Sequence, residues 1–177
     1  MKILKIIGIV VLVILLIFVT LGIIGPDKAH IERSITIKGD KQSVLNYAKS
    51  FKTTYEWTPW LDADKSVKIT LGGADGEVGS SYEWDGNDEV GSGKQTIKTI
   101  TDSSAIIDLN FIRPFESSAV TFFKVKSISN DSTQLSWGFD SEYNFMSSAM
   151  SVVMDFESMM NEQFDKGLGR IKKNLEK

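Results

Sequence analysis

The side chains of this sequence that could do chemistry are few, and they are not clustered. Its 177 residues include a single histidine, His30, and no cysteine. One histidine cannot build a histidine-based catalytic triad or a histidine-rich metal site, and a chain without cysteine has no thiolate nucleophile, disulfide or thiolate metal ligand. We therefore expect no metal and no cofactor, and any catalysis would depend on a carboxylate or a tyrosine.

Three polar side chains in otherwise apolar segments are the strongest candidates for catalysis. Asp108 and Asn110 lie in the run AIIDLNFI, and Gln95 lies in the run before it. A carboxylate buried among apolar residues can act as a general base, because burial raises its pKa. Asp108 and Asn110, however, alternate with Leu109 and Phe111, and alternate side chains of a strand point to opposite faces. We therefore expect Asp108 and Asn110 to face solvent.

Other candidate binding groups are weaker. Arg113, directly before a proline, could orient a carboxylate group of a ligand, or its guanidinium could simply be solvated. The stretch GGADGEVGSS lacks the G-x-x-x-x-G-K-[ST] pattern of a phosphate loop and joins two predicted strands, so we interpret it as a hairpin. Asp62, Asp64 and Asp75 lack the spacing of a calcium-binding loop. The formal net charge of −3, without a basic stripe, argues against nucleic-acid binding.

The first 26 residues differ in composition from the rest of the chain. Residues 6–24 contain no charged side chain, and as a helix they would span about 28 Å, close to the bilayer hydrocarbon thickness of about 30 Å. A cleavable signal peptide has a shorter apolar region that ends in small residues, so we predict an uncleaved, single-pass membrane anchor over residues 1–26. Lys2 and Lys5 precede the span. The positive-inside rule then places the N-terminus in the cytoplasm and residues 27–177 outside it, in the periplasm or the extracellular space.

Residues 27–177 have the pattern of one α+β domain. HIERSITIK alternates as a strand, KQSVLNYAKSF follows as a short helix, and six further strand-like runs are separated by turn residues. Short links between consecutive strands favour an antiparallel sheet. The sequence ends in an amphipathic helix, whose apolar residues recur every three or four positions: Phe156, Met160, Phe164, Leu168, Ile171 and Leu175. We expect this helix to cover the concave face of a curved seven-stranded sheet, with a space left between them.

The segment EWTPW links the short helix to the sheet and places Trp57 and Trp60 on either side of Pro59. Proline fixes its own backbone and restricts the residue before it, so the two rings are held around an irregular turn. The rings could form the mouth of a pocket, or they could seal the short helix against the sheet as core residues.

Two further features lie near the end of the chain. The stretch MSSAMSVVMDFESMM carries five of the six methionines. Flexible thioether side chains suit a surface that adapts to varied ligands, although a helical core is the simpler interpretation. Gly167 and Gly169 interrupt the final helix at about 1 kcal/mol each relative to alanine, which indicates either close backbone approach or space left empty.

Six short motifs, EWTPW, GEVGSSYEWDGN, VGSGKQTI, LNFIRPFE, TQLSWGF and FDKGLGRIKKNLE, occur in this order along the chain. Together they resemble the START-like or SRPBCC superfamily, and more specifically its bacterial polyketide cyclase/dehydrase-like branch, over about residues 30–176. The resemblance implies the helix-grip fold, in which a curved antiparallel sheet wraps around a long C-terminal helix. It also implies a pocket for an apolar ligand between sheet and helix, but no particular reaction, because one fold hosts different functions.

We therefore expect a membrane-anchored module that binds a lipid-like or other apolar small molecule between the sheet and the final helix. A cyclase- or isomerase-type enzyme acting in the same pocket is the first alternative, and an interaction domain without a cavity is the second. No catalytic residues can be assigned. The residues expected to line the pocket are Trp57, Trp60, Tyr82, Trp84, Leu109, Phe111, Phe122, Trp137, Phe139, Phe156, Met160 and Phe164.

Overall fold

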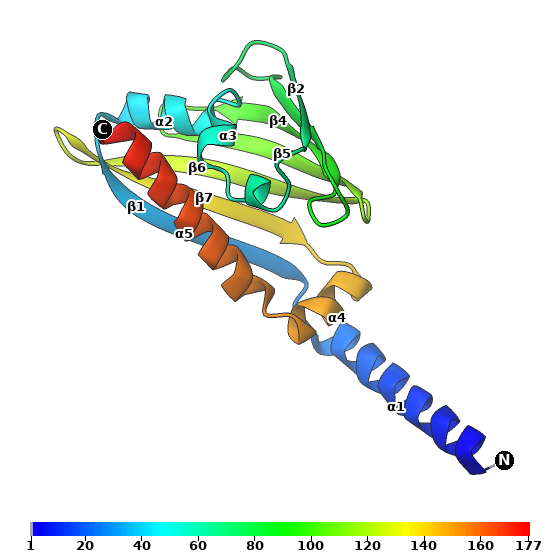
Figure 1. The fold of residues 1–177 in the computed structure, drawn as a ribbon. Coiled ribbons are helices and arrows are strands. Elements are labelled where there is room, and N and C mark those ends of the chain that lie inside the picture. The colour runs from blue at the N-terminus through cyan, green and yellow to red at the C-terminus, as the bar shows by residue number, and fades with distance from the viewer. Residues whose placement is uncertain (1) are drawn as a thin grey trace.

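Seven antiparallel strands form one curved sheet, in the spatial order β1-β7-β6-β5-β4-β3-β2 (Figure 1). The computed structural model describes residues 2–177. Strands β2 to β6 each pair with the next strand along the chain, and β1 pairs with the last strand, β7. The strands are β1 (Lys28–Lys38), β2 (Lys68–Gly72), β3 (Ser81–Asp85), β4 (Ser92–Ile100), β5 (Ser104–Arg113), β6 (Ser117–Ser129) and β7 (Ser132–Glu142).

Helices occur at both ends of the chain and between β1 and β2. They are α1 (Lys2–Ile24), α2 (Lys41–Lys49), α3 (Thr54–Trp57), the 3₁₀ helix η1 (Trp60–Asp62), α4 (Phe145–Val153) and α5 (Phe156–Leu175). The helical end of the chain is thus divided into two helices. Asn144 caps α4 and Asp155 caps α5, each by accepting a hydrogen bond from a backbone N–H three residues later.

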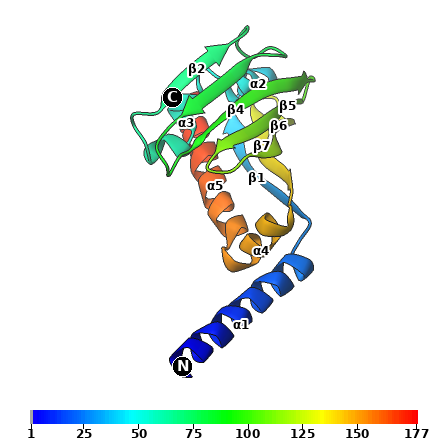
Figure 2. The same ribbon diagram turned by 90° about the vertical axis from the view of Figure 1, so that its right-hand side faces the viewer.

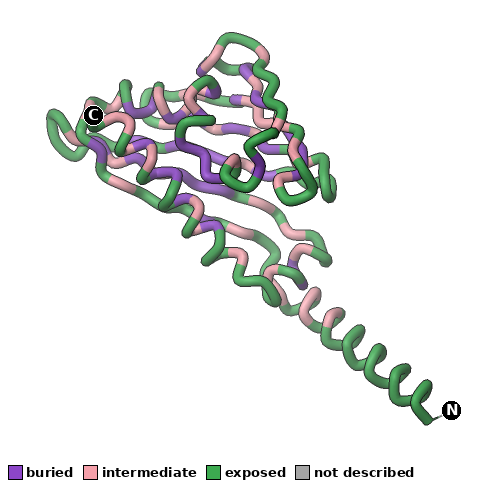
Figure 3. The backbone as a smooth tube through the Cα atoms, in the orientation of Figure 1, coloured by how far each residue is buried: buried purple, intermediate pink, exposed green. Residues whose placement is uncertain are grey.

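The second half of α5 is buried against the concave face of the sheet, as the helical spacing predicted. Phe164, Leu168 and Ile171 expose 2%, 1% and 0% of their surface, and the ring of Phe164 stacks on that of Trp137 with centroids 4.2 Å apart. Figure 3 shows buried residues on this part of α5 and on the strands beneath it. Removing large side chains from water at this interface is the main favourable contribution to folding.

The prediction that Phe122 lines the pocket is wrong, because Phe122 and Phe123 face opposite sides of β6 and Phe123 is the inner one. The register pairs Phe123 with Trp137 and Phe122 with Gly138, and Phe123 belongs to the core beneath α5, which does not include Phe122. Phe122 therefore lies on the outer face and does not line the space between sheet and helix.

Neighbouring residues on the outer face cover Phe122, which explains why it is buried although it points away from α5. A Cβ atom on Gly138 would overlap the Phe122 ring, so the ring lies directly on the glycine backbone. His30 stacks on the same ring, with centroids 6.3 Å apart, and the ammonium group of Lys124 lies 4.0 Å from the ring centroid. A cation over an aromatic face is attracted by the ring quadrupole, so Phe122 is covered by its neighbours on the sheet rather than by a helix.

The two glycines of α5 differ in their surroundings. A Cβ on Gly167 would overlap the Trp137 ring and would lie 3.4 Å from Pro59, whereas a Cβ on Gly169 would meet nothing within 4 Å. Close backbone approach therefore accounts for Gly167, and open space surrounds Gly169. Gly167 lets α5 approach both the sheet and the EWTPW segment.

Helix α1 projects away from the sheet at the end where β1 begins (Figures 1 and 2). Within residues 2–177 it is the one helix that is long and apolar enough to cross a membrane. None of its residues is buried. Its apolar surface is therefore not part of the core of the domain.

Candidate functional site

Four aromatic rings fill the space beneath the second half of α5. Trp57 packs edge-on against Trp137 with ring centroids 5.1 Å apart, and against Phe123 at 5.8 Å. Phe164 covers the other side of Trp137. Trp57 is therefore a core residue, in agreement with the core interpretation of the EWTPW segment. Its indole Nε1 is nevertheless buried without a hydrogen-bond partner within residues 2–177, although buried donors in proteins are almost always paired.

Ion pairs fasten the EWTPW segment to α5. Arg170 donates one hydrogen bond to the carbonyl oxygen of Thr58 and another to the carboxylate of Asp62. The ammonium of Lys166 lies 2.7 Å from the same carboxylate. The hydrogen bonds from Arg170 and Lys166 hold the pKa of Asp62 well below its usual range. Trp60, one turn after Trp57, stays 37% exposed, so the two tryptophans have different environments.

Helix α5 covers only part of the inner face of the sheet. It packs mainly on β1, and Figures 1 and 2 show β2, β3 and β4 curving away from it. On this uncovered part the rings of Trp84 and Phe111 pack edge-to-face, 5.8 Å apart, and both remain half-buried. A Cβ on Gly93 would overlap the Trp84 ring, so the indole lies against the backbone of β4. The inner face of β3–β5 therefore presents partly exposed aromatic rings.

The polar groups on this inner face are uncharged. Gln95 pairs with Tyr82 on one side and Leu109 on the other, which places all three on the inner face. Burial raises the pKa of the Tyr82 phenol to about 12. Within residues 2–177 the register places no carboxylate on the inner face of any strand. Amide and phenol groups can orient a ligand by hydrogen bonds, but neither is a general base near neutral pH.

Asp108 and Asn110 lie on the outer face, as their alternation predicted. Asp108 forms an ion pair with Lys98 at 3.2 Å, and the amide oxygen of Asn110 accepts a hydrogen bond from the hydroxyl of Ser118 at 2.8 Å. Both side chains are therefore separated from the aromatic inner face by the sheet itself.

The first half of α5 completes the inner surface. Phe156 is half-buried and lies against Phe139, with ring centroids 6.2 Å apart, and against Tyr143. Met160, one turn later, is buried. Ten of the twelve predicted lining residues thus belong to the core cluster or pack against it: Trp57, Tyr82, Trp84, Leu109, Phe111, Trp137, Phe139, Phe156, Met160 and Phe164. Trp60 and Phe122 do not.

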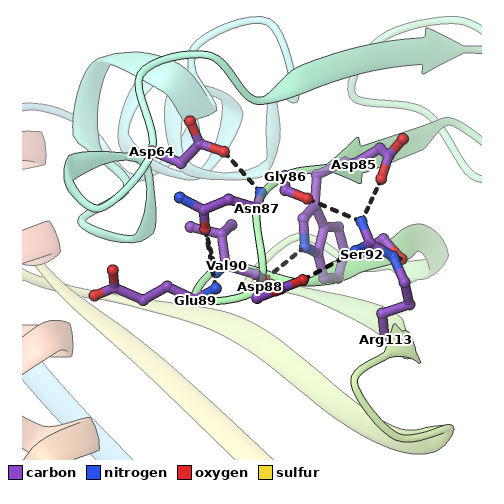
Figure 4. A network of polar contacts seen from close by, with 10 residues as sticks. Asp64, Asp85, Gly86, Asn87, Asp88, Glu89, Val90, Ser92 and Arg113 are labelled. Carbon is purple, nitrogen blue, oxygen red and sulfur yellow. Dashed lines mark hydrogen bonds and ion pairs between the residues drawn. The ribbon is translucent and has the colours of Figure 1, made fainter.

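Arg113 is engaged by the turn between β3 and β4 (Figure 4). Its guanidinium donates hydrogen bonds to the carboxylate of Asp85 at 2.5 Å, to the carbonyl oxygen of Gly86 at 2.9 Å and to the hydroxyl of Ser92 at 3.1 Å. These hydrogen bonds engage Nε and Nη2 of the guanidinium. Arg113 therefore ties the end of β5 to this turn, while its side chain stays 44% exposed.

The same turn is tied to the loop after η1. Asp64 accepts hydrogen bonds from the hydroxyl and backbone N–H of Ser66 and from the backbone N–H of Asn87, as Figure 4 shows for Asn87. These donors lower the pKa of Asp64. Asn87 in turn accepts hydrogen bonds from the backbone N–H groups of Glu89 and Val90. Asp64 thus has a structural role, because its hydrogen bonds hold together the two loops that border the inner face.

A groove that sequence reasoning did not anticipate lies where β6 and β7 separate. The pairing of β6 with β7 begins at Val120 and Asp140, whereas the preceding residues of β6 pair only with β5. The groove has a volume of about 620 Å³, and polar residues of four strands line it, including His30, Asp108 and Asp140. His30 Nδ1 lies 2.5 Å from the Asp140 carboxylate. The alternation of residues within a single strand could not predict this groove, because the groove forms where two strands, β6 and β7, separate.

Groups of side chains that could hold a metal ion are absent from residues 2–177. No protein-family model matches the sequence, and no curated protein matches it. Solved structures are similar in fold only. An aromatase/cyclase from a Streptomyces species is 12% identical, with 84% of this chain and 94% of that chain covered and a TM-score of 0.58.

Two further solved structures show the same arrangement. Norcoclaurine synthase from Thalictrum flavum, in complex with dopamine and hydroxybenzaldehyde, is 9% identical over 88% of this chain and 90% of that chain, with a TM-score of 0.62. The Aha1 dimer from Colwellia psychrerythraea is 14% identical over 84% and 96% of the two chains, with a TM-score of 0.57. This chain therefore has the helix-grip fold, as the resemblance of its motifs implied.

Proposed function

We propose that this protein is a membrane-anchored module that binds a lipid-like or other apolar small molecule on the inner face of β3–β5, beside the first half of α5. The observation that carries the proposal is the partial exposure of Trp84 and Phe111 on a concave sheet face. Binding sites for small molecules are mostly apolar and aromatic, with a few polar groups for orientation. A ligand on this face would remove the remaining exposed ring surface from water.

Two polar groups indicate what the ligand carries. Within residues 2–177 the Trp57 indole N–H is buried without a partner, and Gln95 lies on the inner face of β4. An oxygen atom on an otherwise apolar ligand would satisfy the indole donor, because a buried unpaired donor costs about 1–3 kcal/mol. A ligand with one hydroxyl or carbonyl group fits this arrangement better than a pure hydrocarbon.

Binding is favoured over catalysis by the identity of the inner polar residues. The solved structures of similar fold include enzymes, among them an aromatase/cyclase and norcoclaurine synthase. On this chain the polar groups of the inner strand faces are amide, hydroxyl and phenol groups, apart from Arg33 at the edge, which is paired with Asp165. Proton transfer near neutral pH needs a group whose pKa is close to the working pH. Tyr82, the phenol on this face, has a pKa raised to about 12, so it stays protonated near neutral pH and cannot accept a proton as a general base.

Helix α1 supports the membrane-anchored part of the proposal. Its 23 residues span about 34 Å, enough to cross the hydrocarbon core of about 30 Å. Lys2 and Lys5 at its start favour a cytoplasmic N-terminus. Protease added to intact spheroplasts should then digest residues 27–177, and full protection of these residues would reverse the orientation.

The ligand proposal is tested by a matched pair of adjacent substitutions on β5. Phe111 faces inward and Ile112 faces outward, so Phe111→Ser removes part of the proposed site and Ile112→Ser does not. Native mass spectrometry of the detergent-extracted wild type should detect a co-purifying small molecule of defined mass. Phe111→Ser should lose most of it and Ile112→Ser should keep it, with circular dichroism confirming that both fold. An empty wild-type protein, or equal loss from both variants, would contradict the proposal.

A further inference from the structure

Helix α4 exposes apolar side chains on most of its circumference. We define the α4 surface as the exposed apolar residues of α4 together with the residue directly after the helix: Phe145, Met146, Met150, Val152, Val153 and Met154. Val153 is 65% exposed and Met154 53%. Residues 143–154 contain no charged side chain. Soluble proteins rarely expose a contiguous apolar patch of this kind without a partner that covers it.

The first turn of α4 packs on the end of α1, with Phe145 partly covered by this contact. The ring of Phe145 lies on the backbone of Gly22, where a Cβ atom would overlap it, and contacts Phe18 edge-on with centroids 6.1 Å apart. Ser148 lies in the same way against Gly25. Small residues allow two helices to approach closely, which is typical of helix pairs in membranes. The α4 surface is therefore continuous with the apolar surface of α1.

The position of this contact along α1 determines how deep α4 would lie in the bilayer. Phe18 lies six residues before the end of α1, which corresponds to about 9 Å along the helix axis. If α1 spans the bilayer, its end lies near the boundary of the hydrocarbon core, and α4 lies at that boundary. Amphipathic helices in the membrane interface bury their apolar side by about 5–10 Å, which is the same depth.

A second apolar residue lies at this end of the sheet. Phe115, in the turn between β5 and β6, is 81% exposed. The register places that turn at the same end of the sheet as the end of β7 and the beginning of β1, because Val120 pairs with Asp140 and Asp140 pairs with His30. The domain therefore turns Phe115 and the α4 surface toward the side from which α1 leaves.

We infer that α4 is a second membrane-contacting element, which lies in the interface of the bilayer with the α4 surface among the lipid chains. The inference rests on the proposed anchoring by α1. Lipid is the occupant that fits, because the surface is uncharged, continues that of α1 and lies at the depth of the hydrocarbon boundary. The contact fixes the orientation of the domain and places the beginning of α5, beside the proposed ligand site, close to the lipid.

Single-cysteine labelling tests this inference, since the chain has no cysteine of its own. An NBD fluorophore is attached in the full-length protein at Val153→Cys and Met146→Cys in α4. Leu12→Cys in α1 reports anchoring, and Val78→Cys, which is 61% exposed in the turn at the opposite end of the sheet, is the aqueous control. The protein is reconstituted into phosphatidylcholine vesicles. Quenching is measured with nitroxide-bearing lipids and with aqueous iodide.

We expect the two α4 labels to be quenched by nitroxide lipids at least about twofold more strongly than the Val78 label, and less by iodide. If the Leu12 label is quenched by lipid while the α4 labels behave like the Val78 label, the inference is wrong and the anchor stands. If the α4 labels are shielded from both quenchers, a protein surface covers α4 and the inference is equally wrong. A Leu12 label that nitroxide lipids do not quench would overturn the anchoring and the inference together.

Discussion

Helix α4 and the second half of α5 carry similar patterns of apolar residues but have opposite environments. Phe164, Leu168 and Ile171 recur at spacings of four and three and are buried. Met146, Met150 and Val153 recur at the same spacings and are exposed. Helical periodicity therefore shows that a face is apolar, and tertiary structure decides whether sheet, ligand or membrane covers it.

The largest difference between the two regions should appear when the same side chain is removed from each. Phe164→Ala deletes a ring that stacks on Trp137 in the core, and we expect it to lower the free energy of unfolding by about 3–5 kcal/mol. Phe145→Ala removes an exposed ring from α4 and should cost less than about 1.5 kcal/mol. Chemical denaturation in detergent, followed by tryptophan fluorescence, measures both.

Equal losses for the two phenylalanines would contradict this comparison. They would mean that α4 is packed as tightly as α5 in the folded protein. In that case the α4 surface could not be available to lipid, and its exposure would have another explanation.

Smaller changes in stability, of opposite sign, are expected when the two glycines of α5 are replaced by alanine. Gly167→Ala forces a Cβ into the Trp137 ring and should destabilise the domain by about 1–3 kcal/mol, because a well-packed core resists added volume. Gly169→Ala meets nothing within 4 Å and should stabilise it by up to about 1 kcal/mol, the difference in helix propensity. The same denaturation experiment compares the two. Stabilisation by both substitutions would show that α5 does not approach the sheet closely at Gly167.

The main elements of the fold could be predicted from the sequence because their patterns are local. Alternation in β1 and the spacing of Phe164 and Leu168 depend only on neighbouring residues, and these predictions are confirmed. The sequence left two interpretations open for Trp57, a pocket mouth or the core, and the packing of its ring against Trp137 supports the core. The close approach at Gly167 was one of two interpretations, and only the ring of Trp137 decides between them.

The errors occurred where the answer depends on a partner segment. Phe122 and Phe123 are adjacent, so alternation within β6 allows either ring to face inward, and only pairing with β7 selects Phe123. The methionine-rich stretch was interpreted as a ligand surface or a helical core. It lies for the most part in α4, because capping by Asn144 and Asp155 ends one helix and starts another.

Loss of the ion pairs between Asp62 and α5 should have the smallest effect on stability. This effect concerns α5 and not α4, and it depends on pH. Asp62→Asn removes contacts with Lys166 and Arg170 and should lower the free energy of unfolding near neutral pH by less than about 1 kcal/mol, because the carboxylate is partly solvated. The lowered pKa of Asp62 means that this stabilisation is present above the unfolded value of about 3.9 and is lost as the pH falls toward the folded value.

Urea denaturation at about pH 7 and about pH 3 measures this dependence, since the two values lie on either side of the unfolded pKa. The difference between wild type and Asp62→Asn should narrow at the lower pH, because both carry an increasingly neutral side chain in the unfolded state. Asp108→Asn, which removes one ion pair with Lys98 on the outer face, is the control and should have the smaller effect near pH 7. A difference for Asp62→Asn that does not narrow in acid would mean that packing of η1 against α5, rather than charge, holds the EWTPW segment in place.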